Sequence, residues 1–188
     1  VSGSTRRIYI IDISNASSPQ IESYYDLPAP YRPFDIYVSG RYIYAITTGE
    51  GQSDLLIIDI SNPSKPEMKS SYTFGVTATA LYVSGKYAYI IENNSNRLFI
   101  IDISNPIQPQ LVKNFTINNN PKEIYISGSY AYVVRNSSND IAIIDISDPA
   151  NPQIVATQTV GSQPYDIYVA GHYAYVTNSN SDNISIID

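Results

Sequence analysis

One motif returns along this chain at an almost constant spacing, and this periodicity restricts the fold more than any other feature. The aspartates that close the motif Ile-Asp are Asp12, Asp59, Asp102, Asp145 and Asp188, at intervals of 47, 43, 43 and 43 residues. The glycines of a second motif, Tyr-Val-Ser-Gly or a near copy, are Gly40, Gly85, Gly128 and Gly171. A period of roughly 20 to 50 residues is typical of repeat proteins, in which each repeat is one supersecondary unit that packs against its neighbours.

A single repeat, residues 121–163, reads as four short β-strands. They are expected at 122–127, 130–135, 141–147 and 153–160. Gly-Ser between the first two strands suits a tight hairpin turn, and Asp-Pro-Ala-Asn-Pro before the fourth suits a proline-fixed turn. Four strands in about 43 residues match one blade of a β-propeller. The predicted fold class is therefore all-β, a β-propeller of four-stranded blades with just over four repeats present.

Continuous apolar runs favour this fold over its alternatives. The segments Leu-Leu-Ile-Ile-Asp-Ile (55–60) and Leu-Phe-Ile-Ile-Asp-Ile (98–103) lack the strict alternation of a sheet with one wet face. Such strands are buried on both faces, as the middle strands of a blade are between two neighbouring blades. Val, Ile, Thr and Tyr dominate and no period of 3.6 residues is present, which argues against helices. A β-solenoid is the main rival, but its coils are usually shorter.

The whole chain, residues 1–188, is predicted to be a single β-propeller domain or a propeller segment. Residues 1–12 occupy the same repeat positions as 177–188, so the chain begins and ends on a third strand. If four blades closed into a ring, the strand at 183–188 would be surplus. Three explanations stay open: a window from a longer repeat protein, a strand that pairs with another subunit and builds a fibre, or two chains in one larger ring.

Two sets of repeated side chains are expected to be structural. Twelve of the 18 tyrosines recur at three repeat positions, in the first strand (Tyr37, Tyr82, Tyr125, Tyr168) and in the second (Tyr42/Tyr44, Tyr87/Tyr89, Tyr130/Tyr132, Tyr173/Tyr175). Their rings are expected to fill the space between blades, with a sugar-stacking stripe as the alternative. The repeated Asp and Ser of Ile-Asp-Ile-Ser are expected to hydrogen-bond the backbone beside the following turn.

The repeat also resembles a known family. The pattern Pro-x-x-Ile-Tyr-Val-Ser-Gly-x-Tyr-Ala-Tyr-Val, followed by Leu-x-Ile-Ile-Asp-Ile-Ser-Asn-Pro-x-x-Pro, is similar to the LVIVD repeat of bacterial and archaeal surface or secreted β-propeller proteins. The resemblance covers essentially the whole chain. It implies a propeller at the cell surface or outside the cell, and it implies no particular activity, because a shared fold does not carry a shared function.

Composition disfavours several classes of function. Cysteine is absent, which excludes disulfides, thiol catalysis and zinc–thiolate sites. The net charge is −6 and no Lys/Arg cluster is present, so no nucleic-acid partner is expected. No apolar run approaches the roughly 18 residues of a transmembrane segment. The one histidine, His172, takes a hairpin position that varies among the repeats, and no catalytic constellation is evident, so an enzyme is not expected.

A set of carboxylates is the best candidate for chemistry. The residue two before the first-strand tyrosine is Asp35, Ala80, Glu123 or Asp166. Since the first strand of a blade lines the central channel, the three carboxylates are weak candidates for a Ca²⁺ site or an acid–base pair. The Asn/Ser-rich loops at 92–96, 136–140 and 178–183 are weaker calcium candidates. No other cofactor is expected.

Five Asn-x-Ser/Thr sequons are candidates for glycosylation if the protein is secreted. They begin at Asn15, Asn93, Asn114, Asn136 and Asn183.

The function predicted from these observations is an extracellular or cell-surface β-propeller with a structural or protein-interaction role. Its expected partners are other copies of itself, or other surface proteins, joined by strand exchange in a fibre or surface assembly. The alternative is a carbohydrate-binding module or a glycoside hydrolase that uses Asp35, Glu123 and Asp166.

Overall fold

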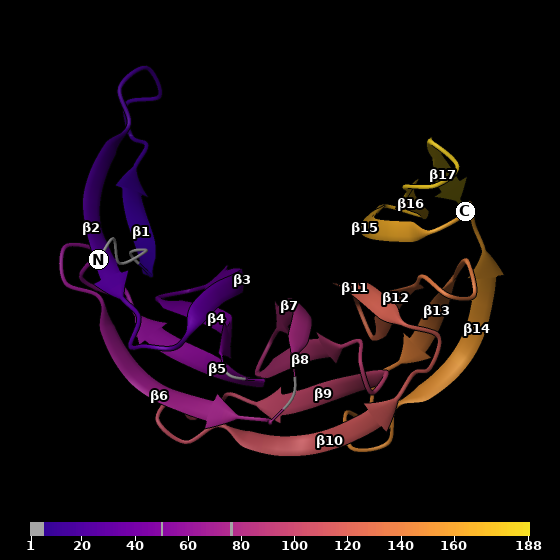
Figure 1. The fold of residues 1–188 in the computed structure, drawn as a ribbon, viewed down its shortest axis with the longest axis horizontal. Coiled ribbons are helices and arrows are strands. Elements are labelled where there is room, and N and C mark those ends of the chain that lie inside the picture. The colour runs from indigo at the N-terminus through magenta and orange to yellow at the C-terminus, as the bar shows by residue number, and fades with distance from the viewer. Residues whose placement is uncertain (1–5, 50, 76) are drawn as a thin grey trace. The chain divides into compact units, whose positions relative to one another are not determined.

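The protein is all-β over the residues that its structure, a computed structural model, describes: 6–49, 51–75 and 77–188. Each sheet is an antiparallel meander in which consecutive strands pair (Figure 1). The predicted fold class and repeat are confirmed. None of the described residues forms a helix that is long and apolar enough to cross a membrane.

The strands group into five sheets that follow the repeat. The first sheet has two strands, β1 (Arg7–Asp12) and β2 (Gln20–Asp26). The second has β3 (Arg32–Ser39), β4 (Tyr42–Gly49), β5 (Gln52–Asp59) and β6 (Glu67–Thr73). The third has β7 (Ala78–Ser84), β8 (Tyr87–Glu92), β9 (Arg97–Asp102) and β10 (Gln110–Thr116). The fourth has β11 (Pro121–Ser127), β12 (Tyr130–Arg135), β13 (Asp140–Asp145) and β14 (Gln153–Thr159). The fifth has β15 (Pro164–Ala170), β16 (Tyr173–Asn178) and β17 (Asn183–Ile187).

The strands form at the positions that the sequence predicts. The four strands expected within 121–163 are β11 to β14, with bounds that differ by one or two residues. Gly128 in the turn between β11 and β12 has a φ of +59°, a conformation that favours glycine. In β5, Leu55 to Ile58 are at most 2% exposed, so the continuous apolar run is buried on both faces of its sheet.

The chain divides into two compact units, which are described separately. The first comprises residues 1–76 and 105–109, and the second comprises 77–104 and 110–188. In the first unit, Ile8 of β1 and Leu27 pack against Ile43, Ala45 and Leu56 of the second sheet. The two-stranded sheet β1–β2 therefore covers part of the sheet β3–β6.

Hydroxyl groups of outer strands add polar links within the first unit. The Ser23 hydroxyl of β2 donates to the carbonyl of Pro63, which lies between β5 and β6. Its repeat equivalent in β6, Ser70, donates to the carbonyl of Pro106 at 2.7 Å. The outer strand of one sheet is thus joined to the Asn-Pro turn of the next repeat.

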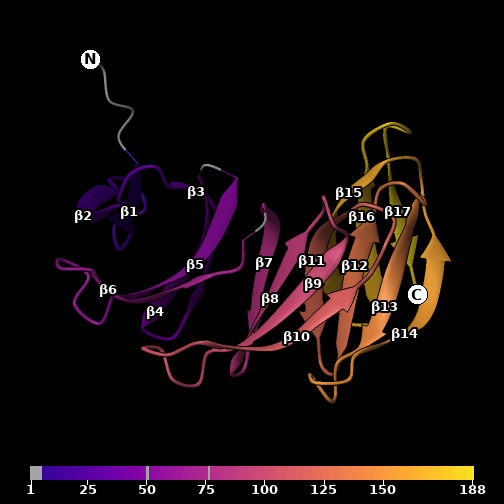
Figure 2. The ribbon, with the colours of Figure 1, turned by 60° about the horizontal axis from the view of Figure 1, so that its bottom comes forward.

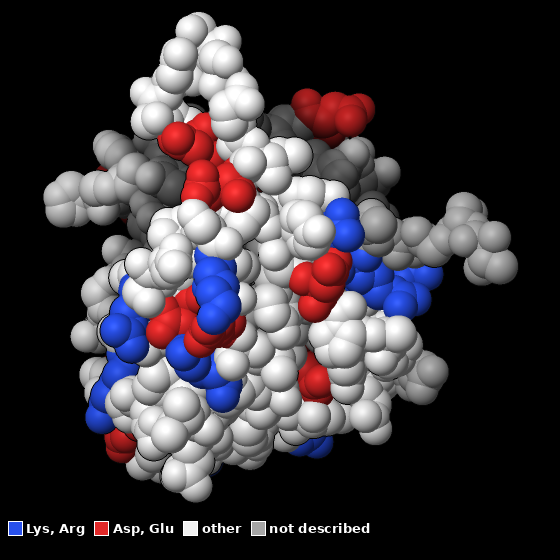
Figure 3. Space-filling model, turned by 90° about the vertical axis from the view of Figure 1, so that its left-hand side faces the viewer, with Lys and Arg blue, Asp and Glu red and all other residues white. Residues whose placement is uncertain are grey.

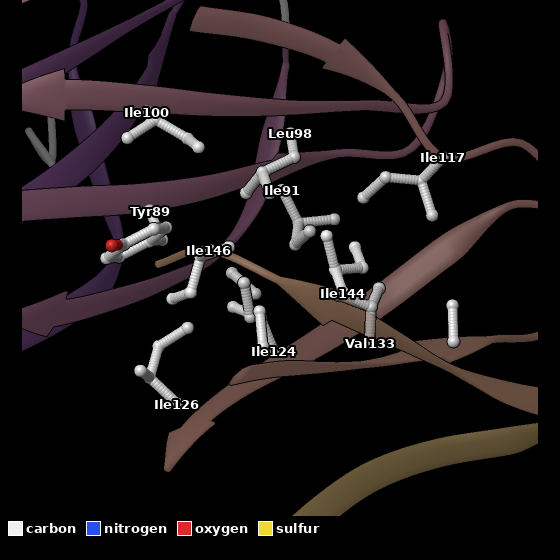
Figure 4. Packing of buried hydrophobic residues seen from close by; sticks show 13 residues of the cluster. Tyr89, Ile91, Leu98, Ile100, Ile117, Ile124, Ile126, Val133, Ile144 and Ile146 are labelled. Carbon is white, nitrogen blue, oxygen red and sulfur yellow. The ribbon is translucent and has the colours of Figure 1, made fainter. Parts of the chain in front are cut away.

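The second unit contains three sheets that lie side by side, with β11 in contact with both β7 and β15 (Figure 2). Figure 4 shows the core between the third and fourth sheets. Ile91, Leu98 and Ile100 face Ile124 and Ile144 there, and all five are at most 2% exposed. A second core joins the fourth sheet to the fifth and contains Val134, Ile141, Ile167, Ala174 and Val176.

Candidate functional site

The carboxylates predicted to line a channel mouth each hydrogen-bond their own strand. The pairing register of β3, β11 and β15 shifts just before the carboxylate, which marks a β-bulge. A side-chain oxygen of each then accepts a hydrogen bond from the next backbone N–H: Asp35 from Ile36 at 2.8 Å, Glu123 from Ile124 at 3.0 Å, and Asp166 from Ile167 at 2.8 Å. The fourth equivalent, Ala80, follows the same bulge in β7. The recurring carboxylate therefore accepts a backbone hydrogen bond at the bulge, although the bulge in β7 forms without one.

The three carboxylates are divided between the two units of the chain. Glu123 and Asp166 lie on neighbouring first strands of the second unit, whereas Asp35 belongs to the first unit. Among the described residues, no group of three or more His, Cys, Asp or Glu side chains is placed to hold a metal ion. A calcium site or an acid–base pair at these positions stays a prediction.

Acidic groups of two Asn/Ser-rich loops also have partners in the protein. Glu92 accepts hydrogen bonds from the backbone N–H groups of Asn94 and Ser95, each at 2.7 Å. Asp140 forms an ion pair with Arg135, with 2.7 Å between Nη2 and Oδ2. These contacts shape the loops, and no further ligand is required to explain the residues in them.

The aspartates of the Ile-Asp-Ile-Ser motif close a tight turn, as expected. Each accepts a hydrogen bond from the backbone N–H two residues on, at 2.8 to 2.9 Å: Asp12 from Ser14, Asp59 from Ser61, Asp102 from Ser104 and Asp145 from Ser147. Hydrogen bonds from the serine backbone and hydroxyl groups lower the pKa of each of these four carboxyls. The motif therefore caps the backbone at the end of the third strand of each repeat, in β1, β5, β9 and β13.

The first-strand tyrosines of the second unit contact one another in sequence. The ring centroids of Tyr82 and Tyr125 lie 5.2 Å apart, and those of Tyr125 and Tyr168 lie 5.1 Å apart, both in tilted or edge-on arrangements. Such geometry is favourable for aromatic pairs. In the second strand, Tyr89 is 3% exposed, and burial raises its pKa to about 12. Tyr44 and Tyr89 therefore pack between sheets, as the sequence predicts, whereas Tyr130, Tyr168, Tyr173 and Tyr175 are exposed.

The fifth sheet has an apolar face that none of the described residues covers, which we call the open face. Its residues are Tyr168, Tyr175, Ile184 and Ile186, which are 60%, 38%, 63% and 65% exposed. The repeat equivalents of Ile184 in the three complete sheets are Leu55, Leu98 and Ile141, which are at most 1% exposed. The open face thus has the composition of a face that is covered elsewhere in the same chain.

The second sheet carries a matching uncovered region on β3. Ile36 and Val38, which we call the β3 patch, are 49% and 54% exposed. They pair directly with Ala45 and Ile43 of β4, so all four lie on one face, and the β4 pair is buried under β1–β2. The equivalents of the β3 patch in β7 and β11 are at most 5% exposed. On this face, β4 and β5 are therefore covered and β3 is not.

A hollow of about 420 Å³ adjoins the edge of β1. Ile10, Ile11 and Ile13 line it together with Glu22 and Pro63. Ile11 and Ile13 are 51% and 73% exposed. Asp12 and Ser14 also line the hollow, so the region beside β1 is accessible and presents both apolar and polar side chains.

The charged groups of the first unit pair with one another. Figure 3 shows basic and acidic side chains intermingled on one face of the molecule. Arg41 and Lys69 each lie 3.5 Å from Asp59, and Lys65 lies 3.1 Å from Glu67. The Lys65–Glu67 pair is exposed and contributes little to stability, whereas Asp59 is buried beneath its two cationic partners.

The sequons differ in how free their asparagines are. Asn15 lies in an exposed turn, and Asn114 is exposed on β10. Asn93 and Asn136 are partly buried, and the side-chain amide of Asn136 donates to the carbonyl of Pro164 at 3.3 Å. Asn183 is exposed on β17, and its side chain accepts a hydrogen bond from Asn178. Glycosylation at these positions stays a prediction.

Comparison with protein families finds the LVIVD repeat along nearly the whole chain. The matched segments are residues 4–26, 34–74, 76–117, 120–159 and 163–188. These segments follow the five sheets of the structure. No curated protein sequence matches the chain.

Solved structures show the same fold at low identity. A protein from Lactobacillus plantarum is similar with a TM-score of 0.78 and 10% identity, over 100% of this chain and 63% of that one. The β-propeller domain of Myceliophteria thermophila Cps50 (Swd1) gives 0.74 and 18%, over 95% and 62%. The periplasmic gluconolactonase PpgL of Pseudomonas aeruginosa gives 0.70 and 15%, over 86% and 50%. This chain spans less than two thirds of each of these structures, and the likeness establishes the β-propeller fold alone.

Proposed function

The chain belongs to the LVIVD repeat family, and from this premise we propose that it is a structural or protein-interaction β-propeller of the cell surface or the extracellular space. Its copies join through uncovered sheet faces and edges into a fibre or surface assembly. Catalysis is not part of this role.

The open face carries the proposal. Ile184 and Ile186 are 63% and 65% exposed, although the same repeat positions in β9, Leu98 and Ile100, are fully buried. Covering an apolar side chain of this size stabilises an association by about 1.5–3 kcal/mol. Apolar patches that are rimmed by polar groups mark interaction sites in soluble proteins. Another β-sheet is the partner that such a face accepts at the other repeats of this chain.

Other features support an extracellular role over a small-molecule site. Charged residues make up only 15% of the chain, and five sequons are present. The alternative, a carbohydrate-binding module or hydrolase, relies on Asp35, Glu123 and Asp166. Each of these carboxylates already caps a bulge in its own strand. Unchanged sugar binding after their replacement with Asn or Gln would remove that alternative.

Sedimentation velocity over a range of protein concentrations tests the proposal. The wild-type chain is expected to form oligomers as its concentration rises. Tyr175→Lys places a charge on the open face and is expected to weaken association by about tenfold or more. Val155→Lys is the matched control, because Val155 is 54% exposed on β14, away from this face. A chain that stays monomeric at all concentrations would contradict the proposal.

Location is tested separately on the source cells. Protease added to intact cells is expected to degrade the protein while it leaves a cytoplasmic marker whole. Protection of the protein until the cells are lysed would show that the surface assignment is wrong.

A further inference from the structure

We propose that a polar hollow in the second repeat binds one neutral sugar residue of a glycan. The hollow has a volume of about 210 Å³ and belongs to the first unit of the chain. Its lining residues are Asp59, Ser61, Asn62, Lys65, Glu67 and Lys69. The proposal goes beyond the proposed function, because it concerns a different surface from the open face and does not depend on association between copies.

The charges of the hollow are not required by the fold. Lys65 and Glu67 flank the second proline of the turn before β6, and Lys69 follows in β6. The same positions carry Gln108, Gln110 and Val112 in the third repeat, Asn151, Gln153 and Val155 in the fourth, and Ser18, Gln20 and Glu22 in the first. The outer strand nevertheless pairs in the same register, bulge included, in all three complete sheets. The set of charges in the second repeat therefore indicates a function rather than a need of the blade.

The charged side chains at the hollow alternate in sign. The Asp59 carboxylate lies 3.5 Å from both Arg41 and Lys69. The Glu67 carboxylate lies 3.4 Å from Lys69 and 3.1 Å from Lys65. All four distances exceed the roughly 2.7–2.9 Å of a close charge-assisted hydrogen bond. Since an ammonium group has three N–H donors, both lysines keep donors for a ligand.

Asp59 gives the hollow a fixed acceptor. Its side chain is only 8% exposed, and one carboxylate oxygen accepts a hydrogen bond from the backbone N–H of Ser61 at 2.9 Å. Hydrogen bonds from Ser61 also lower the pKa of Asp59, so the carboxylate is ionised at neutral pH. The second oxygen, which faces Arg41 and Lys69, can accept a hydrogen bond from a ligand hydroxyl group while the turn stays closed.

The lining favours hydroxyl groups over a charged ligand. The two lysines donate, the two carboxylates accept, and the Ser61 hydroxyl and the Asn62 amide do both. A ligand with one sign of charge would lie against like charges of the lining, whereas a hydroxyl group matches donors and acceptors alike. Pockets for drug-sized ligands measure about 300–1,000 Å³, so this hollow suits a smaller ligand. A single sugar ring, with hydroxyl groups on adjacent carbons, has this size and this chemistry.

A variant built from the chain's own third repeat tests the site. Lys65→Gln/Glu67→Gln/Lys69→Val, which we call the repeat-three variant, gives the hollow the residues of a repeat that forms a complete sheet with them. Binding is measured on an array of immobilised neutral glycans. The wild-type chain is expected to bind at least one of them, and the repeat-three variant is expected to bind it about tenfold or more weakly.

Two controls separate recognition from folding. Asp59→Asn and Asp102→Asn make the same change to the motif in two repeats, but only Asp59 lines the hollow. Asp59→Asn is expected to weaken glycan binding by about tenfold, whereas Asp102→Asn is expected to leave it unchanged. The variant Asp35→Asn/Glu123→Gln/Asp166→Asn is also expected to bind as the wild-type chain does, because these carboxylates lie on first strands and outside the hollow.

Three results would overturn the proposal. The first is that no neutral glycan is bound, or that the repeat-three variant binds as well as the wild-type chain. The second is that only glycans with a carboxylate or sulfate group are bound, because the hollow would then take an anion. The third is an equal loss of binding in Asp59→Asn and Asp102→Asn, because the motif would then act through folding.

Sedimentation velocity of the same preparations distinguishes this proposal from the proposed function. A chain that associates but binds no glycan contradicts the sugar site alone. A chain that binds a glycan but stays monomeric contradicts the proposed association alone. The repeat-three variant is expected to associate as the wild-type chain does, since the open face is unchanged.

Discussion

Arg135 and Asp140 face each other across the hairpin between β12 and β13 as a buried ion pair joined at two points. Arg135 Nε lies 2.8 Å from Asp140 Oδ1, and Nη2 lies 2.7 Å from Oδ2. The Ser138 hydroxyl also donates to this carboxylate. The same positions in the preceding sheet carry Glu92 and Arg97, with the signs of charge reversed. Opposite charges at this point of the hairpin are therefore found in two of the repeats.

Removal of one partner of this pair is expected to be costly. The two side chains are only 8% and 13% exposed, so Arg135→Leu leaves the Asp140 carboxylate buried without its counter-ion. We expect a loss of about 3–5 kcal/mol in the free energy of unfolding, measured by urea denaturation. Arg135→Leu/Asp140→Leu should recover most of it, because an apolar pair has no desolvation cost. A double variant as unstable as the single one would contradict this account.

Stability is expected to fall in acid because of the motif aspartates. Hydrogen bonds from the following serine hold the pKa of Asp12, Asp59, Asp102 and Asp145 below the ordinary value. The unfolded chain therefore binds more protons than the folded chain in the interval below about pH 4. The contribution of these groups is complete above that pH and is lost as the pH falls through the folded-state values. Thermal unfolding followed from pH 6 to pH 2 measures this change.

One variant tests whether the aspartates of the Ile-Asp-Ile-Ser motif cause the loss of stability in acid. Asp102→Asn keeps a side-chain oxygen for the Ser104 amide but removes the titrating group. It should be less stable than the wild-type chain at neutral pH and should lose less stability between neutral and acidic pH. An unchanged pH dependence would mean that other carboxyls cause the acid unfolding.

The strands were predictable because their signals are local. The run from Leu98 to Ile101 has no polar position, so burial on both faces follows from the sequence alone. The hydrogen bond between the Asp35 side chain and the backbone N–H of Ile36 could not be predicted from the sequence. It depends on a bulge, which shifts the strand pairing by one residue and changes which backbone N–H lacks a partner in the neighbouring strand. A signal was present in the segments that begin at Pro33, Pro121 and Pro164, each with a carboxylate two residues after the proline.

Side-chain contacts that depend on how strands pair or sheets pack were not predictable from the sequence pattern. Arg135 and Asp140 are five residues apart, and their pairing requires the hairpin register. The exposure of Ile184 also depends on what packs against its sheet, whereas its residue type is the same as at buried positions. The repeat period therefore predicted the sheets, but it did not predict which sheet faces would be exposed.

The hydroxyl of Tyr89 is expected to lose its proton at a higher pH than an ordinary tyrosine. Burial raises its pKa to about 12, above the ordinary value near 10. The folded chain therefore holds this proton where the unfolded chain loses it, and the stability that it contributes falls between about pH 10 and pH 12. An absorbance titration of tyrosinate should lose its highest transition in Tyr89→Phe. If the titration curves of Tyr89→Phe and the wild-type chain are the same at high pH, the pKa of Tyr89 is not raised.

Two glycines are expected to resist substitution for different reasons. A Cβ added at Gly161 would lie 2.5 Å from Ser181 Oγ and 2.6 Å from Asn178 Cγ. Asn178 is buried and held by hydrogen bonds, so it has little room to move. Gly161→Ala is therefore expected to lower the free energy of unfolding by about 1–3 kcal/mol through overpacking.

Gly128 allows the cost of backbone conformation to be measured without the overpacking expected at Gly161. It has a φ of +59° and open space around an added Cβ, so Gly128→Ala is expected to cost about 1 kcal/mol from backbone strain alone. Gly128→Asn should cost less, because asparagine tolerates this conformation better than alanine. At Gly161, where φ is not positive, asparagine should be at least as harmful as alanine, since its larger side chain meets the same atoms. Urea denaturation of the alanine and asparagine variants at Gly161 and Gly128 measures the loss in the free energy of unfolding. If asparagine is less destabilising than alanine at both glycines, or more destabilising at both, the distinction is wrong.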